Sequence, residues 1–512
     1  MTYTFTSGAT IGSTAVLTQG VTGLDFADAG TGTCAANTQY AAGQSCTVNV
    51  LFTPRSAGTR YGAVALHDNI GDLIATAYLQ GTGVGPQVTF QPSTQNTIDT
   101  FTGGVTWTSG VAVDGGGNIY IVNYDRFGCG LAQLVKETLS NGSYAASVVP
   151  TSTMQCPYGV AVDGAGNIYI TDTSDWRVLK ETPLGASYVE STVASFPVVD
   201  GSAPIGVTVD GSGNVYVTLG VETCVVYKET LTASGYEQST VVSGLPANAG
   251  IAVDGSGNLY IAVDETNGWI VKATPTANGY TQSTIPVNGA GVPFAVAVDG
   301  SDNVYVAFID NNDVGQVFKE TVTANGYAQS TIPTSGLNQP YGVAVDAAGD
   351  VYVADAFNSR AVEENLSSPP SLSFAATPLG STSSDSPQTV TVTNIGNGNL
   401  DFSALTYPAD FPESAGTNGV CTYSTPLAAG NSCALNINFS PVTPLNGASS
   451  AVLSEDVEMT TNANPETQSI AVSGTEVAPT ATTTAASGAT ATYTTSAQNV
   501  SLMALVTSRP EQ

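Results

Sequence analysis

The stretch GVAVDGAGNIYITD, residues 159–172, places an aspartate, three glycines and an asparagine between two runs of apolar and β-branched residues. Val, Ile and Tyr favour extended strands, whereas Asp, Gly and Asn favour the tight turn that joins two strands. The stretch therefore predicts a β-hairpin with Asp163 in its turn. It leaves open whether Asp163 takes part in chemistry or only stabilises the turn.

The same hairpin recurs six times, with its aspartates 44 to 49 residues apart. After the hairpin, the first five copies continue with a VxKET-like run, a Gly-Tyr turn and a QSTI-like run, so each copy predicts four short strands. Because the aspartate is present in every copy, we interpret it as a turn former whose carboxylate accepts hydrogen bonds from backbone amides. The six residues are Asp114, Asp163, Asp210, Asp254, Asp299 and Asp346.

Four-stranded repeats of this length predict an all-β fold of the β-propeller type, in which blades surround a central channel. Six copies predict six blades. The sixth copy lacks a QSTI-like strand, and VTFQPSTQNTI, residues 88–98, looks like the missing one. We therefore predict that residues 88–98 complete the last blade beside residues 360–364 and close the ring.

The repeat GVAVDxxGNIYI(T/A)D resembles the NHL repeat, and ADAFNSRAVEEN, residues 354–365, resembles the longer ending of that motif. The resemblance covers residues 85–366 and implies a six-bladed NHL propeller. It also implies enzyme precedents, because metal-dependent lyases and lactonases occur on related propellers. Those lyases need histidine ligands in the propeller, whereas the single histidine of this chain, His67, lies outside it.

The two flanks of the repeats alternate apolar and polar residues over short strands, as a half-buried β-sandwich requires. Residues 1–84 and 370–477 resemble the immunoglobulin-like modules of bacterial surface proteins, a group that includes the choice-of-anchor D and cilia-associated domains. The first module lacks an opening strand. Residues 478–512 are expected to be a linker followed by the opening strands of a further immunoglobulin-like module.

The charge balance excludes two classes of partner. Eleven Lys and Arg stand against 41 Asp and Glu, which gives a formal net charge of -30. Phosphate binding needs clustered cations, so nucleic acid and anionic membrane surfaces are poor partners. No apolar stretch is long enough to be a transmembrane segment.

The cysteines indicate an oxidising compartment. Two remote pairs share a spacing of twelve residues and an AAGxSC ending, which favours disulfides over a metal site. A third disulfide is predicted because its cysteines reach the same face between adjacent blades. The predicted pairs are Cys34 with Cys46, Cys421 with Cys433, and Cys129 with Cys156.

Cys224 is left over, and we expect it to be an unpaired structural residue rather than a nucleophile, because no base is identifiable near it. With no signal peptide at Met1, the disulfides suggest a fragment of a longer polypeptide that is extracellular, on the cell surface or periplasmic. We expect a monomer within that polypeptide.

One candidate site is an arc of polar residues at the ends of the second strands, on the face where propellers bind ligands. Oxygen ligands suit Ca²⁺, so Asp355, Asn123 and Asp172 in adjacent blades could hold that cation. The alternative, which we favour, is that each side chain binds its own turn, with no metal or catalytic residue present. The six positions are Asn123, Asp172, Leu219, Val263, Phe308 and Asp355.

A second candidate site precedes the first strands, at the mouth of the channel. Its three aromatic residues could stack on a sugar or on a peptide side chain, although packing between neighbouring blades is the preferred interpretation. The six positions are Ser109, Tyr158, Ile205, Ala249, Phe294 and Tyr341.

All five lysines occupy one repeat position at the end of the third strand, where the sixth blade has Glu363. A glutamate directly follows four of these lysines, and its negative charge is expected to cancel the positive charge of the lysine locally. The sequence therefore predicts solvated or paired edge charge that discourages strand addition. The lysines are Lys136, Lys180, Lys228, Lys272 and Lys319.

Together these observations favour a non-catalytic secreted or cell-surface protein in which the propeller is a recognition or scaffold module, with a protein or carbohydrate ligand. Two alternatives stay open. One is a lyase or lactonase-like propeller enzyme that uses a carboxylate-bound cation. The other is a ligand-free structural spacer of a long adhesin-like protein.

Overall fold

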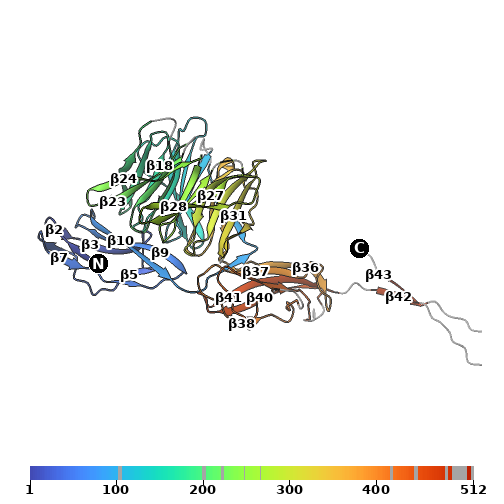
Figure 1. Ribbon diagram of the computed structural model, residues 1–512. Coiled ribbons are helices and arrows are strands. Elements are labelled where there is room, and N and C mark those ends of the chain that lie inside the picture. Colours follow the sequence, from blue (N-terminus) through green and yellow to red (C-terminus); the bar gives the residue numbers. More distant parts are fainter. Residues whose placement is uncertain are drawn as a thin grey trace, which may run out of the picture.

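The computed structural model consists almost entirely of β-strands, and its one described helix is a short 3-10 turn, η1 (Ala356–Asn358) (Figure 1). No described helix is long and apolar enough to cross a membrane. The structure describes residues 1–101, 107–198, 203–220, 224–246, 248–263, 265, 267–323, 325–414, 419–442, 448–478, 482–486 and 504–508.

Between residues 94 and 365 the chain forms six four-stranded antiparallel sheets. The first three, from inside to outside, are β13 (Trp107–Val113), β14 (Ile119–Tyr124), β15 (Gln133–Ser140) and β16 (Ser143–Val149); β17 (Pro157–Val162), β18 (Ile168–Asp172), β19 (Arg177–Leu184) and β20 (Ser187–Ser195); and β21 (Pro204–Val209), β22 (Val215–Leu219), β23 (Cys224–Thr232) and β24 (Gly235–Leu245).

The other three follow the same pattern. They are β25 (Asn248–Val253), β26 (Leu259–Val263), β27 (Trp269–Thr276) and β28 (Gly279–Pro286); β29 (Gly291–Val298), β30 (Val304–Asp310), β31 (Gly315–Thr323) and β32 (Gly326–Ile332); and β33 (Pro340–Val345), β34 (Val351–Asp355), β35 (Arg360–Asn365) and β12 (Thr94–Thr100).

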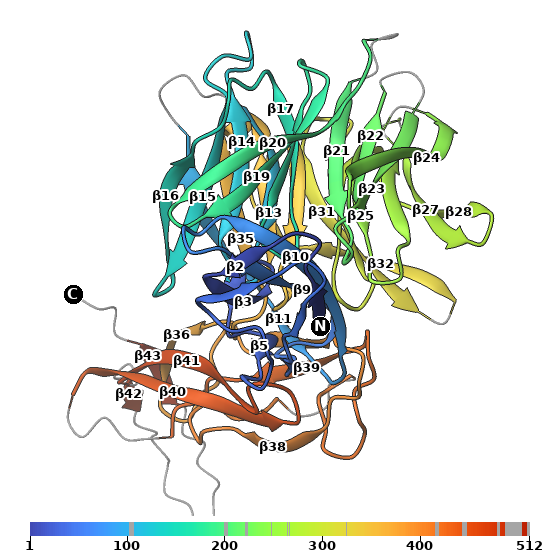
Figure 2. The same ribbon diagram turned by 90° about the vertical axis from the view of Figure 1, so that its left-hand side faces the viewer.

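The innermost strands of these sheets contact one another in a closed cycle, from β13 through β17, β21, β25, β29 and β33 back to β13. The sheets radiate from that cycle, as Figure 2 shows. This arrangement is a β-propeller, the all-β fold that the repeats predict.

The ring is closed by a strand from before the first repeat. β12 pairs antiparallel with β35, with Thr94 opposite Asn365 and Gln95 opposite Glu364, which is the long-range pairing that the sequence predicts. The closing strand is shorter than expected, however. Residues 88–91 form a separate strand, β11 (Val88–Gln91), and Pro92, which follows it, has no backbone N–H to continue a ladder.

β11 instead belongs to the β-sandwich that follows the propeller, where it pairs with β37. One sheet of that sandwich has the order β11-β37-β39 and the other has the order β36-β41-β40-β38. Residues of both sheets share one core that includes Phe90, Val392 and Met459. The remaining strands are β36 (Leu372–Pro378), β37 (Gln388–Asn394), β38 (Phe402–Thr406), β39 (Ser432–Ile437), β40 (Ser450–Thr461) and β41 (Thr467–Val477).

The N-terminal part has a sheet of order β10-β9-β3-β4 and three two-stranded sheets, β1-β7, β2-β6 and β5-β8. Its core includes Phe5, Ile11, Phe26 and Leu66. The strands are β1 (Thr2–Thr4), β2 (Ala9–Ile11), β3 (Ser13–Thr18), β4 (Val21–Thr22), β5 (Phe26–Asp28), β6 (Thr38–Tyr40), β7 (Ser45–Thr47), β8 (Val50–Phe52), β9 (Gly58–His67) and β10 (Leu73–Gly83).

Near the C-terminus, two further strands, β42 (Thr482–Ala486) and β43 (Ala504–Ser508), pair antiparallel. The three predicted disulfides are present: Cys34–Cys46, Cys129–Cys156 and Cys421–Cys433. The side chain of Cys224 lies outside the described part of the chain, so the expectation of an unpaired thiol stays a prediction.

Asp163 stabilises its turn, as the repeat pattern predicts. Its Oδ1 accepts the backbone N–H groups of Ala165 and Asn167, each at 2.9 Å. Its Oδ2 accepts the Asn167 side-chain amide at 2.7 Å and the Tyr169 hydroxyl at 2.9 Å. Gly166 has a φ of +85° in the same turn, which favours glycine. The Asp-to-tyrosine bond recurs at Asp114, Asp210, Asp254, Asp299 and Asp346.

The inner strands pack closely at the glycine that opens the motif in five of the six copies; the fifth copy has Ala295 there. A Cβ atom at Gly159 would lie 2.7 Å from the carbonyl oxygen of Ile205 in the next sheet, and one at Gly342 would lie 2.9 Å from that of Ser109 across the closing point. Because those atoms belong to backbone, only displacement of a whole strand would relieve the clash.

Replacing Gly159 by alanine tests this close packing. We expect Gly159→Ala to reduce the free energy of unfolding by about 1–3 kcal/mol, the usual cost of overpacking, as measured by urea denaturation. Gly130→Ala is the matched control, because a Cβ there meets nothing within 4 Å. Equal stability of the two variants would contradict the role assigned to the inner glycines.

Candidate functional site

One end of the propeller channel is covered by the N-terminal part, which lies against the Asp-Gly turns (Figures 1 and 2). The Thr59 amide donates to the Gly300 carbonyl at 2.9 Å. The Tyr78 hydroxyl donates to Asp163 Oδ2 at 2.7 Å and the Gln80 amide to the Gly255 carbonyl at 2.7 Å. The turn face of the propeller is therefore an internal interface.

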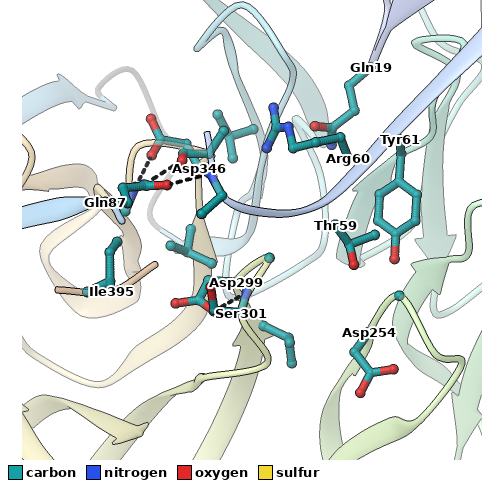
Figure 3. A pocket seen from close by; sticks show the side chains of 18 of the residues that line it. Gln19, Thr59, Arg60, Tyr61, Gln87, Asp254, Asp299, Ser301, Asp346 and Ile395 are labelled. Atoms are coloured by element: carbon teal, nitrogen blue, oxygen red, sulfur yellow. Dashed lines mark hydrogen bonds between the residues drawn. The ribbon is translucent and has the colours of Figure 1, made fainter. Parts of the chain in front are cut away.

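The covered end encloses a polar cavity of about 90 Å³ between the two parts. Figure 3 shows Tyr61 of the N-terminal part pointing toward Asp254 of a turn, with Asp299 on a neighbouring turn and Arg60 directed away from both. These groups already have partners: Arg60 forms an ion pair with Asp25 at 2.6 Å, and the two turn carboxylates accept backbone amides. This end is thus occupied by contacts within the chain.

The N-terminal part does not cover the opposite end, and there the described residues include the three predicted aromatic residues, whose rings lie close together. The Tyr341 ring centroid lies 4.1 Å from that of Phe294 and 6.0 Å from that of Tyr158. Two rings that the sequence pattern missed join them. Trp107 lies 4.8 Å from Tyr341 and 4.6 Å from Phe357. We call these five residues the aromatic mouth.

An arginine covers part of the aromatic mouth. The Arg126 guanidinium carbon lies 4.7 Å from the Trp107 centroid and 4.1 Å from the Phe357 centroid, distances typical of cation–π contacts. Arg126 itself is exposed. Its loop, between β14 and β15, is joined to the start of β17 by the Cys129–Cys156 disulfide, which restricts where Arg126 can lie.

Behind the aromatic mouth, the channel between the inner strands is narrow. The cavity lined by Tyr158, Tyr341 and the inner glycines has a volume of about 60 Å³. Since a water molecule needs about 10–15 Å³ of such space, this cavity has room for only a small number of waters. A ligand at this end must bind on the mouth rather than inside the channel.

The predicted acidic arc is tied into ion pairs. Asp172 Oδ2 lies 2.8 Å from Arg177 Nε, and Asp355 Oδ2 lies 2.6 Å from Arg360 Nε. Burial raises the pKa of Asp172, and the ion pair with Arg177 acts against that rise. Both aspartates are fully buried, so each Oδ2 already faces a cation of its own sheet.

The other oxygens of these aspartates bind the loop that enters the same sheet. Asp172 Oδ1 accepts the Gln155 N–H at 2.6 Å, and Asp355 Oδ1 accepts the Asn338 N–H at 2.7 Å. These backbone amides come from the loop before the first strand and not from the aspartate's own turn, which is the partner that the sequence analysis favours. Across the described residues, no group of three or more His, Cys, Asp or Glu is placed to hold a metal ion.

Asn123 differs from its two counterparts. It is fully buried, and within the described part of the chain neither its oxygen nor its nitrogen has a hydrogen-bond partner. Gln133 stands opposite Asn123 in the ladder, where Arg177 and Arg360 stand opposite Asp172 and Asp355. The remaining predicted positions of the arc, Leu219, Val263 and Phe308, are buried apolar residues.

The lysines do not form the solvated edge that the sequence predicts. Each lies over the ring of the tyrosine on the neighbouring strand at 5.1–5.5 Å, and Lys319 is only 7% exposed. The prediction is wrong because a four-carbon stem packs along an aromatic face while its ammonium stays near the ring.

The glutamates beside the lysines are buried rather than exposed. Glu137, Glu181 and Glu320 are at most 1% exposed, and each has at least one oxygen without a partner. Burial raises the pKa of Glu137 and Glu320 to about 7 and that of Glu181 to about 8. At neutral pH these carboxyls therefore carry less negative charge than exposed glutamates and cancel the lysine charges less than expected.

The contribution of these three glutamates to the free energy of unfolding should therefore fall as the pH rises. A carboxyl whose folded pKa exceeds its unfolded value contributes fully below about pH 4.5, and the contribution is lost as pH increases to about 8 at Glu181. We expect Glu181→Gln to stabilise the protein by about 1–2 kcal/mol at pH 9 and to flatten the pH dependence of the urea midpoint. Exposed Glu237 provides the control, Glu237→Gln. Equal pH profiles for both variants would contradict this expectation.

No protein-family model and no curated protein matches the chain. Solved structures similar to it include a catalytically inactive virginiamycin B lyase from Staphylococcus aureus with quinupristin, at 15% identity over 54% of this chain and 99% of that one, with a TM-score of 0.39.

Two further similar structures are a PQQ-bound aldose sugar dehydrogenase from Streptomyces coelicolor (12% identity, 53% of this chain, 98% of that one, TM-score 0.37) and an auxiliary nutrient binding protein from Bacteroides thetaiotaomicron (15% identity, 69% and 94%, TM-score 0.39). At such identities and TM-scores the similarity carries no information on activity.

Proposed function

We propose that this chain is a non-catalytic recognition module of a secreted, cell-surface or periplasmic protein. In this proposal a six-bladed NHL-type propeller, residues 85–366, stands between immunoglobulin-like domains and binds a protein or carbohydrate ligand. The observation that supports it most directly is the aromatic mouth, five rings gathered at the one channel end that the N-terminal part leaves open.

The chemistry of the mouth favours binding over catalysis. Asp172 and Asp355 are the two carboxylates of this end that could act as an acid or a base. Each forms an ion pair with an arginine and accepts a hydrogen bond from a backbone amide. The propeller contains no histidine, so the ligand set of the related lyases has no counterpart. Aromatic rings, by contrast, supply binding area without a reactive group.

The disulfides and the net charge of the chain support the proposal that the protein is exported. Three disulfides are consistent with an oxidising compartment. The net charge of -30 disfavours nucleic acid and anionic membranes. We propose a monomer within a longer polypeptide, with the flanking β-sandwiches as spacers.

Loss of a central ring should abolish recognition. Tyr341 contacts Phe294, Tyr158 and Trp107, so we expect Tyr341→Ala to weaken binding at least about tenfold, as for a hot-spot residue. The measurement is a glycan and peptide array followed by calorimetry. Tyr423→Ala, an exposed tyrosine of the C-terminal sandwich, is the control. A ligand that binds both variants equally would place recognition elsewhere.

A calcium titration tests the enzyme alternative. Because Asp172 and Asp355 already face arginines, we expect calcium to leave the Tm unchanged at physiological ionic strength. A rise in Tm that Asp172→Asn removes and Asp313→Asn, at an exposed loop aspartate, leaves intact would support a cation-dependent lyase or lactonase instead.

A further inference from the structure

The N-terminal part and the C-terminal sandwich are built alike. In each, a disulfide joins cysteines twelve residues apart, and a phenylalanine ring packs against a glycine of the last long strand. A Cβ atom at Gly81 of β10 would lie 2.6 Å from the Phe52 ring, and one at Gly474 of β41 would lie 2.5 Å from the Phe439 ring. Gly81 is therefore equivalent to Gly474, and Phe52 is equivalent to Phe439.

Among the described residues, one strand of this common plan is present on the C-terminal side only. The C-terminal sheet has the order β36-β41-β40-β38, whereas the N-terminal sheet has the order β10-β9-β3-β4. Since β10 corresponds to β41 and β9 corresponds to β40, no described strand takes the place of β36 beside β10. β10 is consequently an edge strand, whereas β41 is an interior strand of its sheet.

The outer side of β10 has unpaired backbone groups. Besides the ladder with β9, the described part of the chain gives no backbone–backbone hydrogen bond to residues 73–82. Alternate N–H and C=O groups of an edge strand point away from its sheet and can pair with a further strand. The propeller contacts β10 through the side chains of Tyr78 and Gln80, so these contacts leave the edge unpaired.

Apolar side chains beside this edge are more exposed than their equivalents in the C-terminal sandwich. Phe52 is 37% exposed, whereas Phe439 is fully buried. Phe374 of β36 packs near Phe439, with ring centroids 6.0 Å apart. Leu79 of β10 is half-buried, whereas Val472, at the equivalent position beside β36, is 2% exposed. The edge of β10 thus has both the backbone groups and the apolar surface to accept one more strand.

β36 shows which side chains such a strand needs. Leu372 and Phe374 of β36 are buried, whereas Ser373 between them is exposed. This alternation follows from the two-residue period of a strand, which points successive side chains to opposite faces of a sheet. A strand added to β10 therefore needs apolar side chains at alternate positions, with small or polar side chains between them.

The direction and register of the added strand follow from the same comparison. β36 runs parallel to β41, with Phe374 opposite Gly474. The same register at β10 places an aromatic side chain opposite Gly81 and against Phe52. β10 has no charged residue that could pair with a charge on the added strand, and the chain carries a net charge of -30. An acidic strand is therefore disfavoured.

We propose that the free edge of β10 and the ring of Phe52 form an acceptor site for one strand of a partner polypeptide, added parallel to β10. The partner strand carries apolar side chains at alternate positions, one of them aromatic, and no acidic residue. Every described strand of this chain is already paired in a sheet, so we assign the added strand to a second polypeptide of different sequence. The site does not depend on the aromatic mouth and goes beyond the proposed function of the propeller.

A peptide with the sequence of residues 370–379, PSLSFAATPL, is the probe, because it includes the strand that fills the equivalent site. With benzoylphenylalanine in place of Phe374, photocrosslinking to the whole chain and mass spectrometry should identify crosslinks at Phe52 or Gly81. The peptide should also raise the Tm, because it binds only the folded protein. Crosslinks at β41 or at the aromatic mouth instead, or none at all, would overturn the acceptor site.

Matched variants test the chemistry of the site by calorimetry. A peptide with Leu372→Asp and Phe374→Asp should bind at least about tenfold more weakly, because it would bury unpaired charge. In the protein, Ala77→Lys puts a charge on the same face of β10 as Leu79 and should weaken binding of the unchanged peptide to a similar extent. Val452→Lys, at an exposed position of β40, is the charge-matched control. The Tm of each variant without peptide shows whether it remains folded, and equal affinity of both variants would overturn the site.

Two further measurements test the source of the strand. A dimer of the chain alone in sedimentation velocity, abolished by Ala77→Lys, would mean that a second copy fills the edge and would overturn the partner. Protein from its natural host that takes up no peptide, although the recombinant chain does, would assign the strand to the same polypeptide and would also overturn the partner. A monomer that binds the peptide in both preparations supports it. Each outcome is independent of the Tyr341→Ala test of the aromatic mouth.

Discussion

The pairing of β12 with β35 is the constraint on which the rest of the structure depends. It joins residues 94–100 to residues 360–365, and only then do β13 and β33 become neighbours. That contact places Trp107 of the first blade against Tyr341 and Phe357 of the last. Without ring closure the five rings of the aromatic mouth would have no common site.

The segments beside this closure are held by the C-terminal sandwich. β11, just before β12, is an outer strand of the sheet β11-β37-β39, and β36 begins soon after β35 ends. The two sheets of one sandwich thus hold the two chain segments that flank the propeller, β11 in one sheet and β36 in the other. The N-terminal part covers the turn face at the same time and leaves the opposite face of the propeller uncovered by the described parts of the two flanks (Figure 2). A ligand of the propeller would therefore have to approach the face opposite the Asp-Gly turns.

The polar groups of the propeller divide into those with a structural partner and those without one. Each turn aspartate binds amides and a buried tyrosine, and the lysines lie over those tyrosines. The aspartates of the arc bind arginines. Repeated contacts of this kind stabilise every blade and carry no ligand. Unsatisfied groups occur in several blades. Among the described residues, Glu137, Glu181 and Glu320 each have at least one carboxyl oxygen without a partner, and both polar atoms of Asn123 in the first blade have none.

The sequence by itself determined what depends on local chemistry: strands from residue type, turns from Asp163 and its equivalents, the number of repeats, and two disulfides from their spacing. It also indicated the closing strand and three of the five rings, because these recur at fixed repeat positions. Only the tertiary structure decided the rest. Arg126 reaches Trp107 through a loop of irregular length, and β11 pairs outside the propeller with β37, about 300 residues later in the chain. The lysines were misjudged because burial depends on neighbours across strands, which repeat position alone does not specify.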